Sequence, residues 1–332
     1  MHLTISQARS LATGALRRLG LSGDDATVTS DHLVDAALRG MTFGGLPRIL
    51  AIAERLAEHG DNRRPIRIIQ ETPQSALLDG GDNVGYVVAH RATAIAVDKA
   101  TRHGMAIVGA NNTYYTGLFA YYVEMATRAD LVGIAAGNAS AMVAPHGARE
   151  ALLGTNPIAF GFPSTGDPII WDIGTAAIMQ GEVMLHRRLG ETLPEGVALD
   201  KDGAPTRDPA AALAGALRTW GGHRGSGLAI VVQLLGIMCG TPAIPVDHKD
   251  MGFLFIALDP ALLIPAERFK ERAAELADAI RGAAPERGTE EVRMPFDRSA
   301  RERRRQIQDG IDVPDVVYQA LVELRDSPRK GN

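Results

Sequence analysis

The sequence of 332 residues contains a single cysteine, Cys239, and only 5% aromatic residues. One cysteine excludes an internal disulfide framework and a zinc or iron–sulfur centre held by a cluster of cysteines, and it favours a reducing compartment. No apolar run has the length of a membrane-spanning helix, and the longest, Leu228–Cys239, suits a buried helix. Basic residues are also not in excess, because 35 Lys plus Arg stand against 39 Asp plus Glu. Such a chain lacks the positive field of a dedicated nucleic-acid binder.

Several common site motifs are missing as well. The sequence has no G-x-G-x-x-G after a predicted strand, no phosphate-binding P-loop, no H-E-x-x-H, no C-x-x-C and no G-x-S-x-G. Its nine histidines are dispersed, without a pair at i, i+4, so we expect no metal site. The first twenty residues lack the continuous apolar core of a signal peptide. We therefore expect a cytoplasmic protein whose partners include neither a membrane nor a nucleic acid.

The patterns that are present predict an alternation of helices and strands. Thr4-x-x-Gln7 is a capping-box pattern that opens a first helix through about Leu19, and Pro47 marks the start of another. A second helix is expected to follow residues 22–25 and to run to Leu38, and further helices are expected at 86–103, 117–129, 175–189, 228–239, 266–280 and from 298. Strands are expected at 66–69, 76–78, 105–110, 132–137, 157–163, 168–174, 252–258 and 292–295. Strand–helix–strand alternation with short links is typical of the α/β class.

Polar residues gather in glycine-containing segments that connect the predicted helices and strands. Arg39–Leu46 is either an active-site loop or a plain turn between helices. Gly221–Gly227, which includes Arg224, either binds an anion through free backbone N–H groups or is a flexible loop before a helix. Gly154–Pro157 offers its polar groups to a ligand or simply forms a turn. Asp172 is either a helix-capping residue or a partner of a ribose or substrate.

Neither of two charged segments is expected to form a functional site. Residues 191–208 are rich in Pro, Gly and Asp, but their spacing matches no calcium-binding loop, so we expect a surface loop. The basic run 298–305 is typical of a solvated helix face.

The order of several longer motifs carries a family resemblance. These stretches are LRGMTFGGLPR (38–48), LLDGGDNVGY (77–86), PHGAREALLGTNPIAFGFP (145–163), WDIGTAA (171–177), PEGVALDKDGAPTRDP (194–209) and GGHRGSGLAI (221–230). Together they make the chain similar to the malate/L-lactate dehydrogenase family of the second type. That family also includes ureidoglycolate dehydrogenase, diketogulonate reductase and Δ1-piperideine-2-carboxylate reductases.

The resemblance implies a non-Rossmann α/β fold that binds NAD or NADP, in a homodimer with the active site near the subunit interface. It implies three parts: a helical cap at 1–62 with a catalytic loop at 39–48, a central α/β domain at 63–125 plus 290–332, and a cofactor-binding α/β domain at 126–289. The cofactor-binding residues expected from it are Tyr114, Thr116, Gly117, Thr155, Asp172, Ile173, Gly174, His223, Arg224 and Arg298.

The sequence departs from the family at its acid–base positions. Relatives read R-G-x-x-S-H-G-x-x-R in the catalytic loop, where this chain has Phe43 for the serine and Gly44 for the histidine. A second family histidine corresponds to Tyr115. The loop arginine remains as Arg48, which the resemblance assigns to the substrate carboxylate. We expect Tyr115 to act as the acid.

The missing histidines bear on the choice of reaction. A ketone needs a proton when hydride reaches it, and loss of a positioned acid typically costs a factor of about 10² to 10⁴. A cyclic imine can enter already protonated, and Tyr114 or His223 are further possible donors. We therefore expect an NAD(P)H-dependent oxidoreductase that reduces a small carboxylate-bearing cyclic imine or 2-oxo acid. The alternative is a redox-inactive or repurposed relative that binds a nucleotide or small carboxylate, or that performs lyase or isomerase chemistry.

Overall fold

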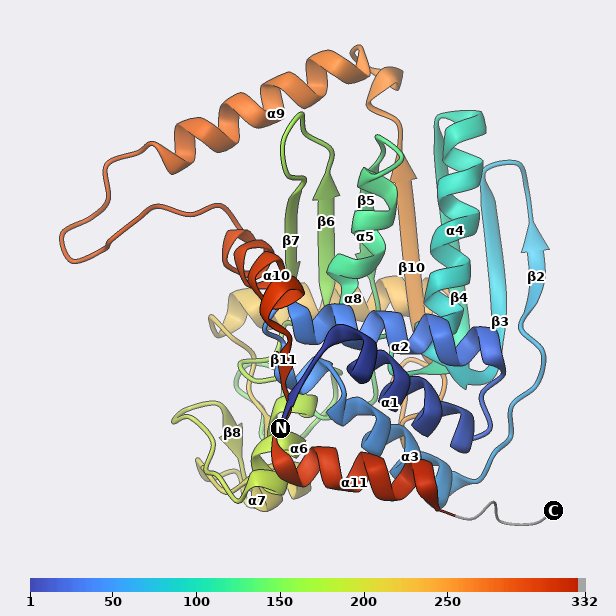
Figure 1. The fold of residues 1–332 in the computed structure, drawn as a ribbon, viewed down its shortest axis with the longest axis vertical. Helices are drawn as coiled ribbons and strands as arrows, with labels where there is room; N and C mark the ends of the chain where they lie inside the picture. Colours follow the sequence, from blue (N-terminus) through green and yellow to red (C-terminus); the bar gives the residue numbers. More distant parts are fainter. Residues whose placement is uncertain (328–332) are drawn as a thin grey trace.

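A seven-stranded mixed β-sheet runs through the centre of the molecule (Figure 1). The computed structural model describes residues 1–327, so residues 328–332, which the predicted central domain includes, lie outside the described residues. The order across the sheet is β2 (Arg67–Glu71), β3 (Ser75–Val84), β4 (Met105–Tyr114), β10 (Met251–Leu258), β5 (Val132–Ala136), β6 (Ile158–Phe162) and β7 (Ile169–Ile173). Strands β3 and β4 are parallel, and the other neighbouring pairs are antiparallel. The expected α/β class is confirmed.

Helix α4 (Gly85–His103) makes the crossover that a parallel pair of strands requires. Its alanines at 89, 92, 96 and 100 are fully buried in a cluster with residues of β3, β4 and β10. This spacing of three and four residues places small side chains on one helix face, so α4 lies close against the sheet. Gly104, at φ 80°, ends the helix in a left-handed conformation that favours glycine.

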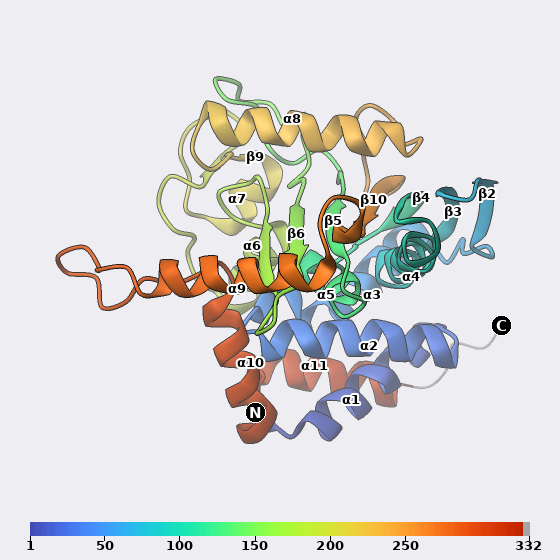
Figure 2. The same cartoon turned by 90° about the horizontal axis from the view of Figure 1, so that it is seen from above.

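Both faces of the sheet are covered by helices. Helix α5 (Phe119–Thr127) shares the face of α4, and α8 (His223–Met238) covers the opposite face (Figure 2). Helices α1 (Ile5–Arg18), α2 (Gly23–Leu38) and α11 (Asp315–Asp326) form a further layer beyond α4 and α5, and α3 (Pro47–His59) contacts α1 and α11. The predicted capping box is confirmed, because Gln7 N donates to Thr4 Oγ1 and Thr4 N donates to Gln7 Oε1.

The remaining elements surround this core. They are β1 (His2–Leu3), paired with β11 (Ile311–Asp312); β8 (Ala198–Leu199), paired with β9 (Ala216–Leu217); the helices α6 (Gln180–Leu189), α7 (Pro209–Ala214), α9 (Ala266–Arg281) and α10 (Asp297–Asp309); and two 3-10 turns, Thr42–Gly44 and Pro260–Leu262. In Figure 1, α9 crosses the end of the sheet and its connection to α10 projects from the body.

Three predicted boundaries were wrong. Helix α8 begins at His223 rather than at residue 228, and the predicted strand at 292–295 has no pairing partner among the described residues. The backbone N–H of Met294 instead donates to Asp297 at the start of α10. Helix α6 begins at residue 180 rather than 175, because the N–H and hydroxyl of Thr175 both donate to the carbonyl of Thr155.

The central sheet can be compared with the three parts that the family resemblance implies. Strands β2 to β4 come from the segment expected to form the central domain, and β5, β6, β7 and β10 come from the segment expected to bind the cofactor. One continuous sheet thus contains strands of both segments. The division into a cap, a central domain and a cofactor-binding domain stays a prediction.

Candidate active site

A cavity of about 490 Å³ lies where the first turns of α3 and α6 approach the ends of β4, β5 and β7. Its volume is within the range of small-molecule sites. The wall includes Met41, Phe43, Gly44, Arg48, Tyr86, Tyr115, Thr116, Gly117, Leu118, Asn138, Thr155, Asp172, Ile173, Gly174, Met179, Gln180, Gly181, Glu182, Trp220 and Met251. Eight of the twelve residues predicted as catalytic or cofactor-binding therefore meet in one place.

The joint between α2 and α3 borders this cavity. Arg39, at its start, is buried and is held by ion pairs with Asp35 and Glu124. The chain then makes a 3-10 turn that brings Phe43 and Gly44 to the cavity wall. The joint therefore contributes to the cavity wall, and its role as an active-site loop stays a prediction.

Arg48 is the one basic side chain among the residues that line the cavity. It is the second residue of α3, which starts at Pro47. Its guanidinium carbon lies 4.2 Å from the ring centre of Tyr115, a distance typical of a cation–π contact. Within residues 1–327, no carboxylate lies within ion-pair distance of it. A fixed positive charge therefore faces the cavity and is available to an anion.

Tyr115 reaches the cavity through an unusual backbone conformation. It has φ 55° and follows the last residue of β4, so the chain turns sharply there. Its side chain is 8% exposed, and burial raises its pKa, although the nearby Arg48 and Arg55 act in the opposite direction. Tyr115 is thus a neutral phenol with a proton to donate at neutral pH.

Asp172 joins the cavity wall to the start of α5. Its Oδ2 accepts a hydrogen bond of 2.7 Å from the N–H of Ala120, in the first turn of that helix. Burial raises its pKa to about 6, against the lowering effect of hydrogen bonds from Ala120 and Phe119. Asp172 therefore fits both earlier interpretations, since it bonds a helix N-terminus and also faces the cavity.

Four predicted residues do not line the cavity. Tyr114 is 1% exposed and packs beneath the guanidinium of Arg55, at 3.6 Å. His223 and Arg224 lie exposed in the first turn of α8, three and four residues after the cavity residue Trp220. Arg298 is exposed at the second position of α10. Their roles toward a cofactor stay predictions.

Three cavity neighbours were missed from the sequence. Gln180 and Glu182 belong to the first turn of α6 and line the cavity. His248 lies just behind the wall, with its ring centre 5.6 Å from that of Tyr115 and its Nε2 3.2 Å from Nε2 of Gln180. No local pattern marks a contact between residues 68 positions apart. The available signal in the sequence was that His248 lies in a polar loop and had no role assigned to it.

Residues 1–327 contain no group of three or more His, Cys, Asp or Glu side chains arranged to hold a metal ion. In the same part of the chain, no helix combines the length and apolar character needed to cross a membrane.

The family model of malate/L-lactate dehydrogenases matches residues 3–322. The chain belongs to this family. The resemblance carried by the loop and glycine motifs is therefore confirmed, including the relationship to ureidoglycolate dehydrogenases and cyclic imine reductases.

Relatives in this malate/L-lactate dehydrogenase family cover nearly the whole chain. L-sulfolactate dehydrogenase of Methanocaldococcus jannaschii is 34% identical over 98% of this chain and 96% of its own length. The solved sulfolactate dehydrogenase structure from that organism has a TM-score of 0.86, covering 98% of this chain and 96% of that one. Ureidoglycolate dehydrogenase (NAD(+)) of Escherichia coli O157:H7 is 30% identical, with 97% and 95% covered. The Δ1-pyrroline-2-carboxylate/Δ1-piperideine-2-carboxylate reductase of Pseudomonas aeruginosa is 31% identical, with 98% and 99% covered.

Proposed function

We propose that this family member is an NAD(P)H-dependent reductase of a small, singly charged carboxylate that carries a cyclic imine or 2-oxo group. The observation that carries the proposal is the guanidinium of Arg48, which has no carboxylate partner within residues 1–327 and faces a cavity that also contains Tyr115. An arginine binds a carboxylate through two parallel hydrogen bonds, which fixes the orientation of the carbon next to it.

The charges of the wall support a substrate with one anionic group. Beside Arg48, the lining residues include two carboxyl groups, those of Asp172 and Glu182. A second carboxylate or a sulfonate on the substrate would have no basic lining residue to pair with. A protonated imine nitrogen, by contrast, is attracted by the acidic side chains. The cavity thus favours an iminium carboxylate or a monocarboxylic 2-oxo acid over a dianion.

Further polar groups of the cavity wall fit the nicotinamide end of the cofactor. Thr155 and Asp172 offer a hydroxyl and a carboxyl group, and Gly174 lines the same cavity. His223 and Arg224, at the N-terminus of α8, would meet the phosphates of an extended dinucleotide. The bound cofactor supplies hydride. The name of one relative specifies NAD(+), and the choice between NAD and NADP is an outcome of the binding experiment.

The roles of the chain's own residues follow from this geometry. Arg48 holds the substrate carboxylate and so orients the carbon that is reduced. Tyr115 donates a proton from its hydroxyl to the developing alkoxide of a 2-oxo acid. Phe43 excludes water from that end of the cavity. An iminium substrate needs no such proton, so the absence of a histidine at Gly44 is tolerated for that class.

A binding titration with NADH and NADPH, followed by turnover with a panel of cyclic imine carboxylates and 2-oxo acids, tests the function. Bound nucleotide is detected by energy transfer from Trp220, which lines the cavity, and turnover by loss of the reduced cofactor. Oxidation of either cofactor by a monocarboxylic substrate is expected. Failure to bind either nucleotide would refute the proposal, whereas binding without turnover on any substrate would favour a repurposed relative.

We also propose that the protein is a homodimer in the cytoplasm. The face of α8 directed away from the sheet exposes Val231, Leu234 and Met238, each between 50% and 58%. An apolar surface of this kind is typical of an interface. Leu234→Glu should convert a dimer into a monomer in light scattering.

The buried Cys239 supports the proposed cytoplasmic location, because a free thiol suits a reducing compartment.

A further inference from the structure

The loop between α8 and β10 places His248 against the outside of the cavity wall. Its Nε2 lies 3.2 Å from Nε2 of Gln180, and its ring is tilted against that of Tyr115. Gln180 and Tyr115 both line the cavity, while His248 does not. The histidine can therefore act on a substrate through these neighbours.

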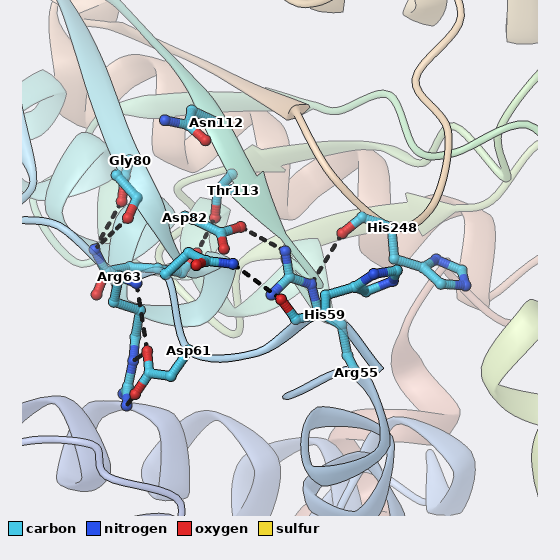
Figure 3. Close-up of polar contacts among 12 residues, drawn as sticks. Arg55, His59, Asp61, Arg63, Gly80, Asp82, Asn112, Thr113 and His248 are labelled. Atoms are coloured by element: carbon cyan, nitrogen blue, oxygen red, sulfur yellow. Dashed lines mark hydrogen bonds and ion pairs between the residues drawn. The ribbon is translucent and has the colours of Figure 1, made fainter. Parts of the chain in front are cut away.

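Hydrogen bonds hold the backbone of His248 from both sides. Its N–H donates to Ser140 Oγ at 2.9 Å. Its carbonyl accepts from Arg55 Nε at 3.1 Å, as Figure 3 shows. Arg55 is 2% exposed and is itself held by an ion pair with Asp82 and by the ring of Tyr114. A buried charged group thus fixes the position of the loop.

The loop keeps an unfavourable backbone conformation at this point. Asp247, His248 and Asp250 have φ values of 55°, 51° and 50°. A left-handed conformation costs a residue other than glycine on the order of 1 kcal/mol or more, and persists only when its surroundings impose it. Three such residues within four positions indicate that the placement of His248 is imposed rather than incidental.

The tautomer of His248 follows from its two ring nitrogens. Nδ1 is buried and has no hydrogen-bond partner within residues 1–327. A buried N–H without an acceptor is the rarer and more costly defect, so the proton is expected on Nε2 and a lone pair on Nδ1. The N–H at Nε2 then needs an acceptor at Gln180. The two ends of an amide have nearly the same shape, and a half-turn of the side-chain amide presents its oxygen.

We propose that His248 is a positioning residue that orients the amide of Gln180 for substrate binding. Nε2–H of His248 donates to Oε1 of Gln180, which directs the NH₂ group of Gln180 into the cavity. That NH₂ group donates to an oxygen of the substrate carboxylate held by Arg48, whose guanidinium borders the neighbouring Gly181. This role rests on the proposed reductase function.

Kinetics of matched variants test the pair. His248→Leu and Gln180→Leu should each raise KM about tenfold, the effect of losing one hydrogen bond to a charged group. Neither should change kcat or cofactor binding more than about twofold. The double variant should be no worse than either single variant, because both changes remove the same contact. His248→Gln, which keeps a donor near the position of Nε2, should recover most of the affinity.

His59→Leu is the matched control, because His59 is a histidine on α3 that does not line the cavity. It should leave KM unchanged. An unchanged KM in His248→Leu, additive effects in the double variant, or loss of cofactor binding together with KM would each overturn the positioning role.

A measurement that needs no turnover separates this role from the proposed function. Nitrogen-15 spectra of histidine-labelled protein report which ring nitrogen carries the proton, and His248→Gln identifies the signal. The expected result is a neutral ring with the proton on Nε2, and a shifted Nε2 signal in Gln180→Leu. A proton on Nδ1 would overturn the positioning role even in an active enzyme. A wild-type protein without turnover would instead refute the proposed function, and the tautomer would then decide only whether His248 orients the amide of Gln180.

Discussion

The guanidinium of Arg48 lies over the ring of Tyr115, with 4.2 Å between its central carbon and the ring centre. Both residues line the cavity. The proposed carboxylate anchor and the proposed proton donor are thus in direct contact. Any substrate bound by Arg48 is placed beside the phenol of Tyr115, so substitutions of the two residues should separate binding from proton transfer.

Arg48→Lys should raise KM for monocarboxylic substrates by about one to two orders of magnitude while kcat changes less. Lysine keeps the positive charge but loses the planar pair of donors that matches a carboxylate. Steady-state kinetics with the preferred substrate measure both constants. A fall in kcat with an unchanged KM would show that Arg48 acts in the chemical step instead.

Tyr115→Phe should lower kcat for a 2-oxo acid by a factor of about 10² or more, the typical value of a positioned acid. The same change should affect a cyclic imine far less, because that substrate carries its own proton. The informative quantity is the ratio between the fall in kcat for the 2-oxo acid and the fall in kcat for the cyclic imine. Equal losses for both substrates would indicate that Tyr115 supports binding or packing rather than proton donation.

Restoring the family serine and histidine should favour 2-oxo acids. A Cβ atom at Gly44 would lie 3.7 Å from Met41 Cβ and 3.8 Å from Ala36 Cβ, which is ordinary contact, and the backbone there needs no glycine. The double variant Phe43→Ser/Gly44→His should therefore fold. We expect a higher kcat/KM for 2-oxo acids and little change for cyclic imines, with Phe43→Ser alone as the control. A gain for cyclic imines would contradict the account of the missing histidine.

Acid should destabilise the protein through His32. This residue of α2 is 1% exposed, and its Nε2 accepts a hydrogen bond from the N–H of Leu118. Burial, assisted by Arg39 and His90, lowers its pKa from 6.5 to about 3. Between pH 6.5 and pH 3 the unfolded chain therefore binds a proton at this histidine, whereas the folded chain does not. The free energy of unfolding falls as the pH drops from 6.5 toward 3. The loss at the acid end is on the order of 4 kcal/mol.

Urea unfolding between pH 7 and pH 4 measures this contribution. His32→Gln keeps a hydrogen-bond acceptor and should flatten the pH dependence, whereas the exposed His103→Gln should leave it as in the wild type. Identical slopes in all three proteins would exclude the proposed contribution of His32.

Local signals in the sequence were sufficient for much of the fold. Capping at Thr4, Pro47 at a helix start and the alanine face of 89–100 define their elements through residues close in sequence, and the structure has them. The strand expected at 292–295 failed because a strand requires a neighbour, which local pattern does not supply. The short strands β1 and β11 were missed for the same reason, since they pair across nearly the whole chain.

Prediction of the site was limited in the same way, because local motifs were visible in the sequence and contacts between distant segments were not. The loop motif led to Phe43, Gly44 and Arg48, because these residues are close in sequence. The resemblance selected Tyr115 as the acid and also assigned Tyr114 to the cofactor, but local pattern did not show that the left-handed turn at Tyr115 brings only the second of these side chains to the cavity wall. The contact between Gln180 and His248 depends on how α6 and the loop before β10 pack together.

Transfer of a label tests the central claim most directly. The wild-type protein is incubated with reduced cofactor carrying deuterium at nicotinamide C4 and with its preferred cyclic imine carboxylate or 2-oxo acid, and the product is examined by mass spectrometry and NMR. The account predicts one deuterium on the carbon next to the carboxylate, delivered from a single face of the nicotinamide. Product without deuterium, or no product from any monocarboxylic substrate, would contradict it.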